Sequence, residues 1–168
     1  MAANLYTHQS ENIFKTWLLM FLFIVLVVGL GYAVAYYFQN ITILYGFIAF
    51  SLIMNIYAYW NSDKVAIKQA HAVPAEKSEY RELHNLVENL AITAGLPKPR
   101  VYIINDSSPN AFATGRNPEH SAIAVTTGLL EILDKSELEG VIAHEMAHIG
   151  NRDILVMSVA VVLAGFIA

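Results

Sequence analysis

The chain has 168 residues, of which 56% are hydrophobic and only 14% are charged, and its mean hydropathy is +0.46. This charged share is far below the usual quarter of a soluble domain, so the composition indicates a membrane protein. The net charge of −4 without a basic run argues against a nucleic-acid-binding surface, and the lack of cysteine excludes disulfides and thiolate metal sites.

The chain starts with a polar segment, residues 1–13, which we interpret as a short cytoplasmic tail. Residues 16–38 follow as a nearly unbroken apolar run. About twenty helical residues, rising 1.5 Å each, cross a bilayer core of roughly 30 Å, so this run predicts a first transmembrane helix. Ala33-Val34-Ala35 resembles a signal-peptidase site, but the run is long for a signal peptide and a second apolar run comes at once, which argues against cleavage.

The second apolar run covers residues 41–60, after a turn at Gln39-Asn40. Residues 14–60 are therefore predicted to form a two-span transmembrane hairpin. Lysines flank the two apolar runs on the side away from the turn, and none lies in the turn: Lys15, Lys64 and Lys68. Because positive charge favours the cytoplasmic side, we expect both ends of the hairpin, and the domain that follows, to face the cytoplasm.

A small mixed α and β region is predicted next. Residues 61–78 form a polar link, and residues 79–94 place apolar side chains at the i, i+3, i+4 spacing of an amphipathic helix. Residues 100–104 are typical of a strand. Two short extended runs, residues 110–115 and 121–126, surround a turn-forming segment and predict a β-hairpin.

One strand of that hairpin is our candidate for an exposed sheet edge, on which a peptide can bind as an added strand. The candidate substrate-binding residues are Asn110, Ala111 and Phe112. Asn110 equally suits a role as a turn cap. His120 in the hairpin turn, and His84 in the preceding helix, are interpreted as surface or packed side chains.

The chemistry centres on His144-Glu145-x-x-His148. On a helix, positions i and i+4 share a face, so both imidazoles can bind one ion, and Glu145 lies beside it as a candidate catalytic base. Catalytic Zn²⁺ takes three protein ligands and keeps a position for water. The capping box Ser136-Glu137-Leu138-Glu139 predicts that the helix starts at about Ser136. The alternative is a surface helix with two unrelated histidines.

Polar residues follow the motif before the chain becomes apolar again. Asn151 and Asp153 are candidates for orienting a ligand imidazole through a hydrogen bond. Residues 154–168 carry no charge and are interpreted as the start of a third transmembrane helix. If the helix continued unbroken from His148, the metal would lie about 9 Å from this apolar segment.

The chain resembles the HtpX-type membrane zinc metalloproteases, a gluzincin-like group related to the CAAX prenyl proteases. The resemblance rests on Ser62-Asp63-Lys64, on residues 95–102, 109–118 and 124–130, and on residues 138–148 with Asn151-Arg152-Asp153. It implies a mainly α integral membrane protein in which a transmembrane hairpin precedes an α+β zincin-like domain with a small β-sheet, here residues 79–153.

The resemblance also implies a function. Such proteins are multi-pass inner-membrane endopeptidases with a cytoplasmic active site, and they act in stress response on damaged or misfolded membrane proteins. By this similarity His144 and His148 bind one Zn²⁺ per full-length chain and Glu145 is the catalytic base. The expected partners are unfolded or membrane-protein substrates and the lipid bilayer.

The third zinc ligand of that group is a glutamate on a later helix, and no residue of this chain matches it. We therefore expect the chain to be an incomplete form with weak metal affinity and little activity. The alternative is a non-catalytic, membrane-anchored binding or adaptor protein that keeps the fold. A transporter subunit is disfavoured, because few ionisable residues lie inside the spans.

Overall fold

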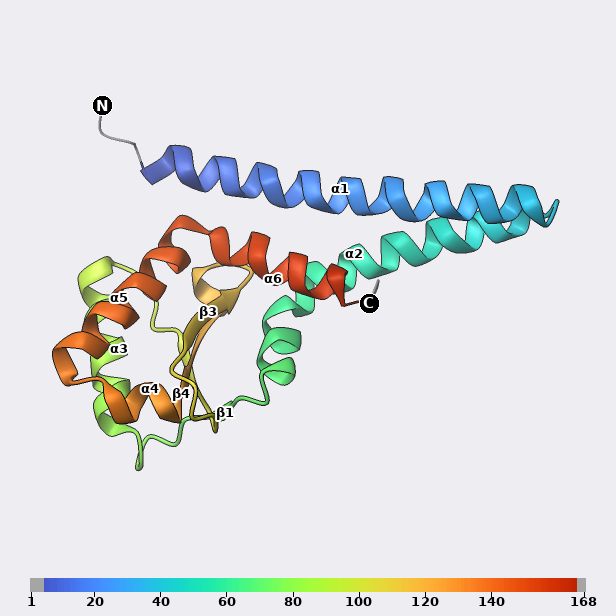
Figure 1. Cartoon of the computed structure of the whole chain (residues 1–168). Helices are drawn as coiled ribbons and strands as arrows, with labels where there is room; N and C mark the ends of the chain where they lie inside the picture. Colours follow the sequence, from blue (N-terminus) through green and yellow to red (C-terminus); the bar gives the residue numbers. More distant parts are fainter. Residues whose placement is uncertain (1–4, 166–168) are drawn as a thin grey trace.

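Two long helices form an extended hairpin beside a smaller mixed unit (Figure 1). The computed structural model describes residues 5–165; helix α1 spans Leu5–Tyr37 and helix α2 spans Ile41–Gln69. Between them Gln39 has a left-handed φ of 52°, and the Asn40 side chain accepts a hydrogen bond from the Thr42 N–H as the N-cap of α2. Both helices are long and apolar enough to cross a membrane, which confirms the predicted hairpin.

The helices extend beyond the apolar runs at both ends. Helix α1 starts at Leu5, so it includes most of the segment interpreted as a tail, and α2 continues through residues 61–69, about half of the segment interpreted as a link. Polarity marks where a helix leaves an apolar environment, but helix ends are set by caps and tertiary contacts. The polar extensions contact the rest of the molecule, for example through Asp63, which pairs with Arg100.

The sheet has four strands in the order β1-β2-β4-β3. Its strands are β1 Val73–Pro74, β2 Arg100–Ile104, β3 Ala111–Gly115 and β4 Ser121–Thr126, with the short 3₁₀ helix η1, Pro118–His120, before β4. Strand β4 pairs in parallel with β2 and antiparallel with β3, so the predicted hairpin of β3 and β4 is confirmed. All six residues of β4 are buried, whereas β3 is an edge strand of this sheet.

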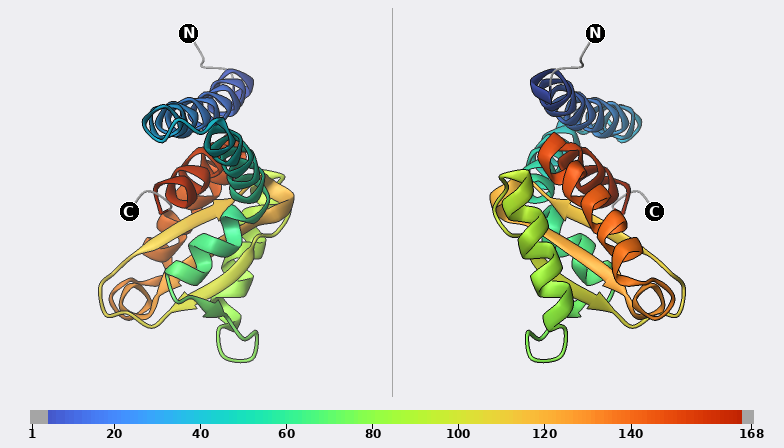
Figure 2. Two further views of the ribbon diagram at one scale, coloured as in Figure 1. Left: turned by 90° about the vertical axis from the view of Figure 1, so that its right-hand side faces the viewer. Right: turned by 90° about the vertical axis from the view of Figure 1, so that its left-hand side faces the viewer.

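Helices cover both faces of the sheet, as the two opposite views in Figure 2 show. Helix α3, Arg81–Ala94, and helix α5, Lys135–Asn151, pack on one face, where Val87, Ile123 and Ile142 are fully buried. The short helix α4, Thr127–Ile132, links β4 to α5. The C-terminal part of α2 lies on the other face.

The N-cap of helix α5 is Asp134, two residues before the predicted cap, Ser136. The Asp134 carboxylate accepts hydrogen bonds from the N–H groups of Ser136 and Glu137, and the Glu137 carboxylate accepts one from the Asp134 N–H. The prediction of a capping box starting at Ser136 is therefore wrong. Asp is as good an N-cap as Ser, and the residue with extended backbone takes the role: Asp134 has ψ 172°, while Ser136 is already helical.

Helix α5 also does not continue unbroken. Arg152 adopts a left-handed φ of 58°, and α6, Asp153–Ala164, leaves at 86° to α5. Helix α6 then packs against α1 and α2, with Leu155 and Val159 in one buried cluster with Phe23 and Ala58. A third span starting at residue 154 stays a prediction, since α6 reaches the required length only if the bent pair counts as one span, and residues 166–168 lie outside the described residues.

Candidate metal centre

The two histidines of α5 turn toward one another. Their Nε2 atoms lie 3.1 Å apart, and their rings meet nearly at right angles, at 87°. Two zinc–nitrogen bonds of about 2.0–2.1 Å at a tetrahedral angle would separate their nitrogens by about 3.3 Å. The spacing of His144 and His148 therefore fits two ligands of a single zinc ion.

Asp153 holds the second of these rings. Its Oδ2 lies 2.8 Å from Nδ1 of His148, the ring nitrogen that faces away from His144. A carboxylate that accepts from Nδ1–H fixes the tautomer in which Nε2 keeps its lone pair for a metal. The left-handed residue Arg152 makes this contact possible, because it turns the chain so that Asp153 comes back over the last turn of α5.

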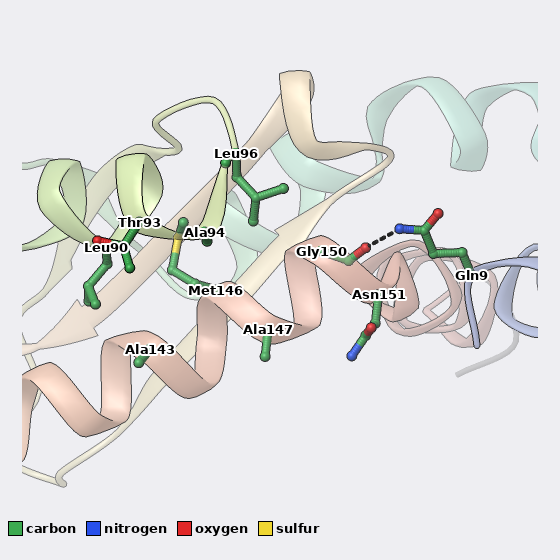
Figure 3. A pocket seen from close by; sticks show the side chains of 11 residues that line it. Gln9, Leu90, Thr93, Ala94, Leu96, Ala143, Met146, Ala147, Gly150 and Asn151 are labelled. Carbon is green, nitrogen blue, oxygen red and sulfur yellow. Dashed lines mark hydrogen bonds between the residues drawn. The ribbon is translucent and has the colours of Figure 1, made fainter. Parts of the chain in front are cut away.

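Helix α1 supports the turn between α5 and α6. Gln9 donates from Nε2 to the carbonyl oxygen of Gly150 at 2.7 Å (Figure 3), and Asn12 donates from Nδ2 to that of Asn151 at 3.1 Å. Carbonyls in the last turn of a helix lack intrahelical partners, so the two carboxamides act as a C-cap supplied by another helix. These bonds offset part of the roughly 1–2 kcal/mol that a left-handed non-glycine residue costs.

The other predicted imidazole partner, Asn151, lies elsewhere. It lines a separate cavity of about 640 Å³ between α3 and α5, and its main chain accepts the hydrogen bond from Asn12. His84 and His120 also lie away from the pair: Nε2 of His84 is 2.9 Å from the Ala75 carbonyl oxygen, and Nδ1 of His120 is 2.8 Å from Oδ1 of Asn117.

Glu145 reaches from α5 to the edge of the sheet. Its Oε2 accepts a hydrogen bond of 2.8 Å from the backbone N–H of Ala113 in β3. The carboxylate is thus held between the histidine pair and the edge strand. Sequence reasoning named Glu145 but missed this contact, which joins residues 32 positions apart and involves a backbone group that no side-chain pattern reveals.

Two of the three candidate substrate-binding residues lie in the edge strand and one lies before it. Ala111 and Phe112 belong to β3, whereas Asn110 precedes it and is exposed. The main chain of Asn110 donates to Oγ1 of Thr126 at 2.9 Å and accepts from the Thr126 N–H at 3.0 Å. Asn110 therefore extends the pairing of the hairpin through its backbone, and its side chain remains open to solvent.

Within residues 5–165, the structure brings no group of three or more His, Cys, Asp or Glu side chains into an arrangement that could hold a metal ion. The fit to zinc thus rests on the two imidazoles, on the Asp153 carboxylate that is hydrogen-bonded to His148, and on the position of Glu145. This set is the donor chemistry of a zinc peptidase motif on a helix.

Comparison with known proteins agrees with this geometry. The sequence model described as Peptidase family M48 matches residues 77–167. The chain is 48% identical over 165 residues to a "Protease HtpX homolog" of Caldanaerobacter subterraneus subsp. tengcongensis, covering 98% of this chain and 55% of that protein. Proteins of the same name match in Pyrococcus furiosus, at 50% identity with coverage of 91% and 52%, and in Burkholderia ambifaria, at 47% with 71% and 42%. The chain spans about half the length of the curated relatives it matches.

Proposed function

The chain belongs to Peptidase family M48, and from that premise we propose that it carries the zinc-binding and proton-transferring groups of a membrane-bound endopeptidase. The observation that supports this most is the convergence of the His144 and His148 Nε2 atoms, 3.1 Å apart, next to a carboxylate on a sheet edge. In this proposal, residues 14–60 anchor the protein in the bilayer and residues 79–153 carry the site.

His144 and His148 would hold the zinc through Nε2. Zinc, when bound, supplies a Lewis acid for the scissile carbonyl and lowers the pKa of a water molecule. Glu145 accepts the proton of the attacking water and delivers it to the leaving amine. The Ala113 N–H keeps the Glu145 carboxylate in place, and Asp153 keeps His148 in the tautomer that binds metal.

The substrate is a polypeptide bound in extended form along β3. An exposed edge offers main-chain hydrogen bonds that tolerate many sequences, as a protease acting on damaged or misfolded membrane proteins requires. The lysines outside the hairpin ends support an inner-membrane topology with the site facing the cytoplasm. The lipid bilayer is then the second partner.

Substitution of Glu145 by Gln tests this proposal. The variant keeps the size of the side chain and both histidines, so zinc content should be unchanged while peptide hydrolysis by the micelle-purified protein falls by about 10²–10⁴-fold, the usual contribution of a general base. Asp134→Asn is a matched control, because this carboxylate caps the far end of the same helix. Hydrolysis that survives Glu145→Gln at full rate would contradict the assignment and favour a binding or adaptor role.

A further inference from the structure

A second cavity lies beside the edge strand, on the face opposite α5. It has a volume of about 400 Å³ and is lined from three elements: Ala66 and Gln69 with the cap residue Ala70 at the end of α2, Phe112, Ala113 and Thr114 of β3, and Met157, Ser158 and Val161 of α6. None of the described residues that line it is charged. The cavity is thus an apolar recess with the candidate substrate strand as one wall.

The pairing of β3 decides which of its groups a substrate can use. Asn110 and Thr126 are bonded through their main chains, so by alternation Phe112 and Thr114 also bond to β4, while Ala111 and Ala113 direct their N–H and C=O groups outward. The bond from the Ala113 N–H to Glu145 confirms this direction. A peptide added at this edge can therefore pair with the N–H and C=O of Ala111 and with the C=O of Ala113, whose N–H is already bonded to Glu145.

Side chains of paired strands that lie opposite each other point to the same face of the sheet. A substrate residue opposite Ala113 points toward the α5 face, and its neighbours point, like Phe112 and Thr114, toward the cavity. The substrate bond nearest Glu145 is consequently flanked by a side chain that enters the recess.

We propose that this cavity is a specificity subsite that takes an apolar side chain of the substrate, on the residue adjacent to the one opposite Ala113. The identity of the occupant, a substrate side chain, rests on the proposed peptidase function. The position of the subsite rests on the register of β3.

The polar groups of the cavity explain why the occupant is apolar. The Ser158 hydroxyl is buried and already engaged, 2.8 Å from Oγ1 of Thr114 and 3.3 Å from the N–H of Gly115. A charged substrate side chain would lose its water there without meeting an opposite charge, since the other polar side chain of the lining, Gln69, is uncharged. Phe112, Met157 and Val161 instead offer apolar contact, and the flexible Met157 can adapt to side chains of different shape.

The chain has no cysteine, so a single introduced thiol reports binding without hydrolysis. In the full chain in micelles, Met157→Cys should be protected from alkylation by short Ala/Ser peptides that carry one Leu or Phe, roughly threefold or more above the protection given by the same peptides with Asp or Lys. Ile92→Cys on α3 is the control, since Ile92 is 73% exposed and lies outside the lining of this cavity. Equal protection by Leu and Asp peptides, or none, overturns the subsite.

Hydrolysis gives the second readout. Val161→Trp should fill the recess and lower kcat/KM for the Leu peptide by about tenfold relative to the all-Ala/Ser peptide, whereas Val161→Ala should shift the preference toward Phe. Protection of the thiol in the Met157→Cys variant without cleavage of any peptide supports the subsite while the proposed function fails. Cleavage without an apolar preference, and without protection, overturns the subsite while the function stands.

Discussion

The two regions of this molecule use similar apolar residues in opposite ways. In the sheet-bearing unit, Ile123 and Ile142 are fully buried, whereas in helix α2, Ile53 and Ile56 are each 61% exposed. The first region encloses its apolar side chains as a water-facing domain does, and the second presents them outward as membrane-spanning helices do. The polar ends of the hairpin supply hydrogen bonds to the sheet-bearing unit, as between Asp63 and Arg100, while its apolar runs pack against α6.

The candidate metal centre lies where these two regions join. Helix α5 belongs to the core of the sheet-bearing unit, while α6 belongs to the cluster formed with α1 and α2. Asp153, which orients His148, is the first residue of α6 and follows directly on the bend. The ligand geometry thus depends on how the hairpin is held against the sheet.

The largest contrast is expected from one substitution made in each region. Ile123→Ala leaves a cavity in a fully buried position and should lower the free energy of unfolding by about 2–5 kcal/mol. Ile53→Ala, the same chemical change at a 61% exposed position, should change it by less than about 1 kcal/mol. Denaturant unfolding in micelles measures both, and equal effects would contradict the assignment of the α2 face to lipid.

Removal of the ion pair between the regions should have the next largest effect. Asp63 on α2 is 5% exposed and accepts a 2.6 Å hydrogen bond from Nη2 of Arg100 in β2. Asp63→Ala should cost about 1.5–3 kcal/mol, as for hydrogen bonds to charged groups. The same unfolding measurement with Lys98→Ala, which breaks a surface pair with Glu88, is the control and should show little change.

The Asp153 carboxylate, which is hydrogen-bonded to His148, is expected to affect metal affinity more than folding. Asp153→Ala should weaken zinc binding by about 10–100-fold, since His148 loses the partner that sets its tautomer. Asp153→Asn, which can still accept a hydrogen bond, should recover part of this loss. Zinc titration against a competing chelator measures both, and unchanged affinity in the Ala variant would remove Asp153 from the site.

The smallest effect is expected at the start of α1. Gln9→Ala and Asn12→Ala each remove one hydrogen bond to the bend and should cost about 0.5–1.5 kcal/mol. Asn61→Ala is the matched control, because among the described residues its carboxamide is bonded within its own helix, to the Tyr57 carbonyl. If the bend holds His148 in place, the NMR signal of its Nδ1–H should broaden in the first two variants and stay sharp in the control.

Local signals in the sequence predicted much of this structure. The β2 strand, the β3–β4 hairpin, the end of α3 at the left-handed Gly95 and the histidine pair all follow from patterns within a few residues. The N-cap of α5 was misplaced by two residues because Asp134 and Ser136 are comparable caps, and only the folded backbone shows which one leaves the helix.

Long-range contacts could not be predicted in the same way. The Gln9 bond to Gly150 joins residues 141 positions apart, and the Ala113 bond to Glu145 uses a backbone donor. The bend at Arg152 places a residue with a β-carbon in a conformation that favours glycine, so local propensity argues against it. The Gln9 bond depends on packing between the two regions and the Ala113 bond on packing of α5 against the sheet, and no single window of sequence contains either.

The central claim is that His144 and His148 bind one zinc ion between them. X-ray absorption of the zinc-loaded protein measures this most directly. We expect a zinc coordination shell with two imidazole nitrogens at about 2.0–2.1 Å, and loss of that shell in both His144→Ala and His148→Ala. A shell that is unchanged when either histidine is removed would contradict the account.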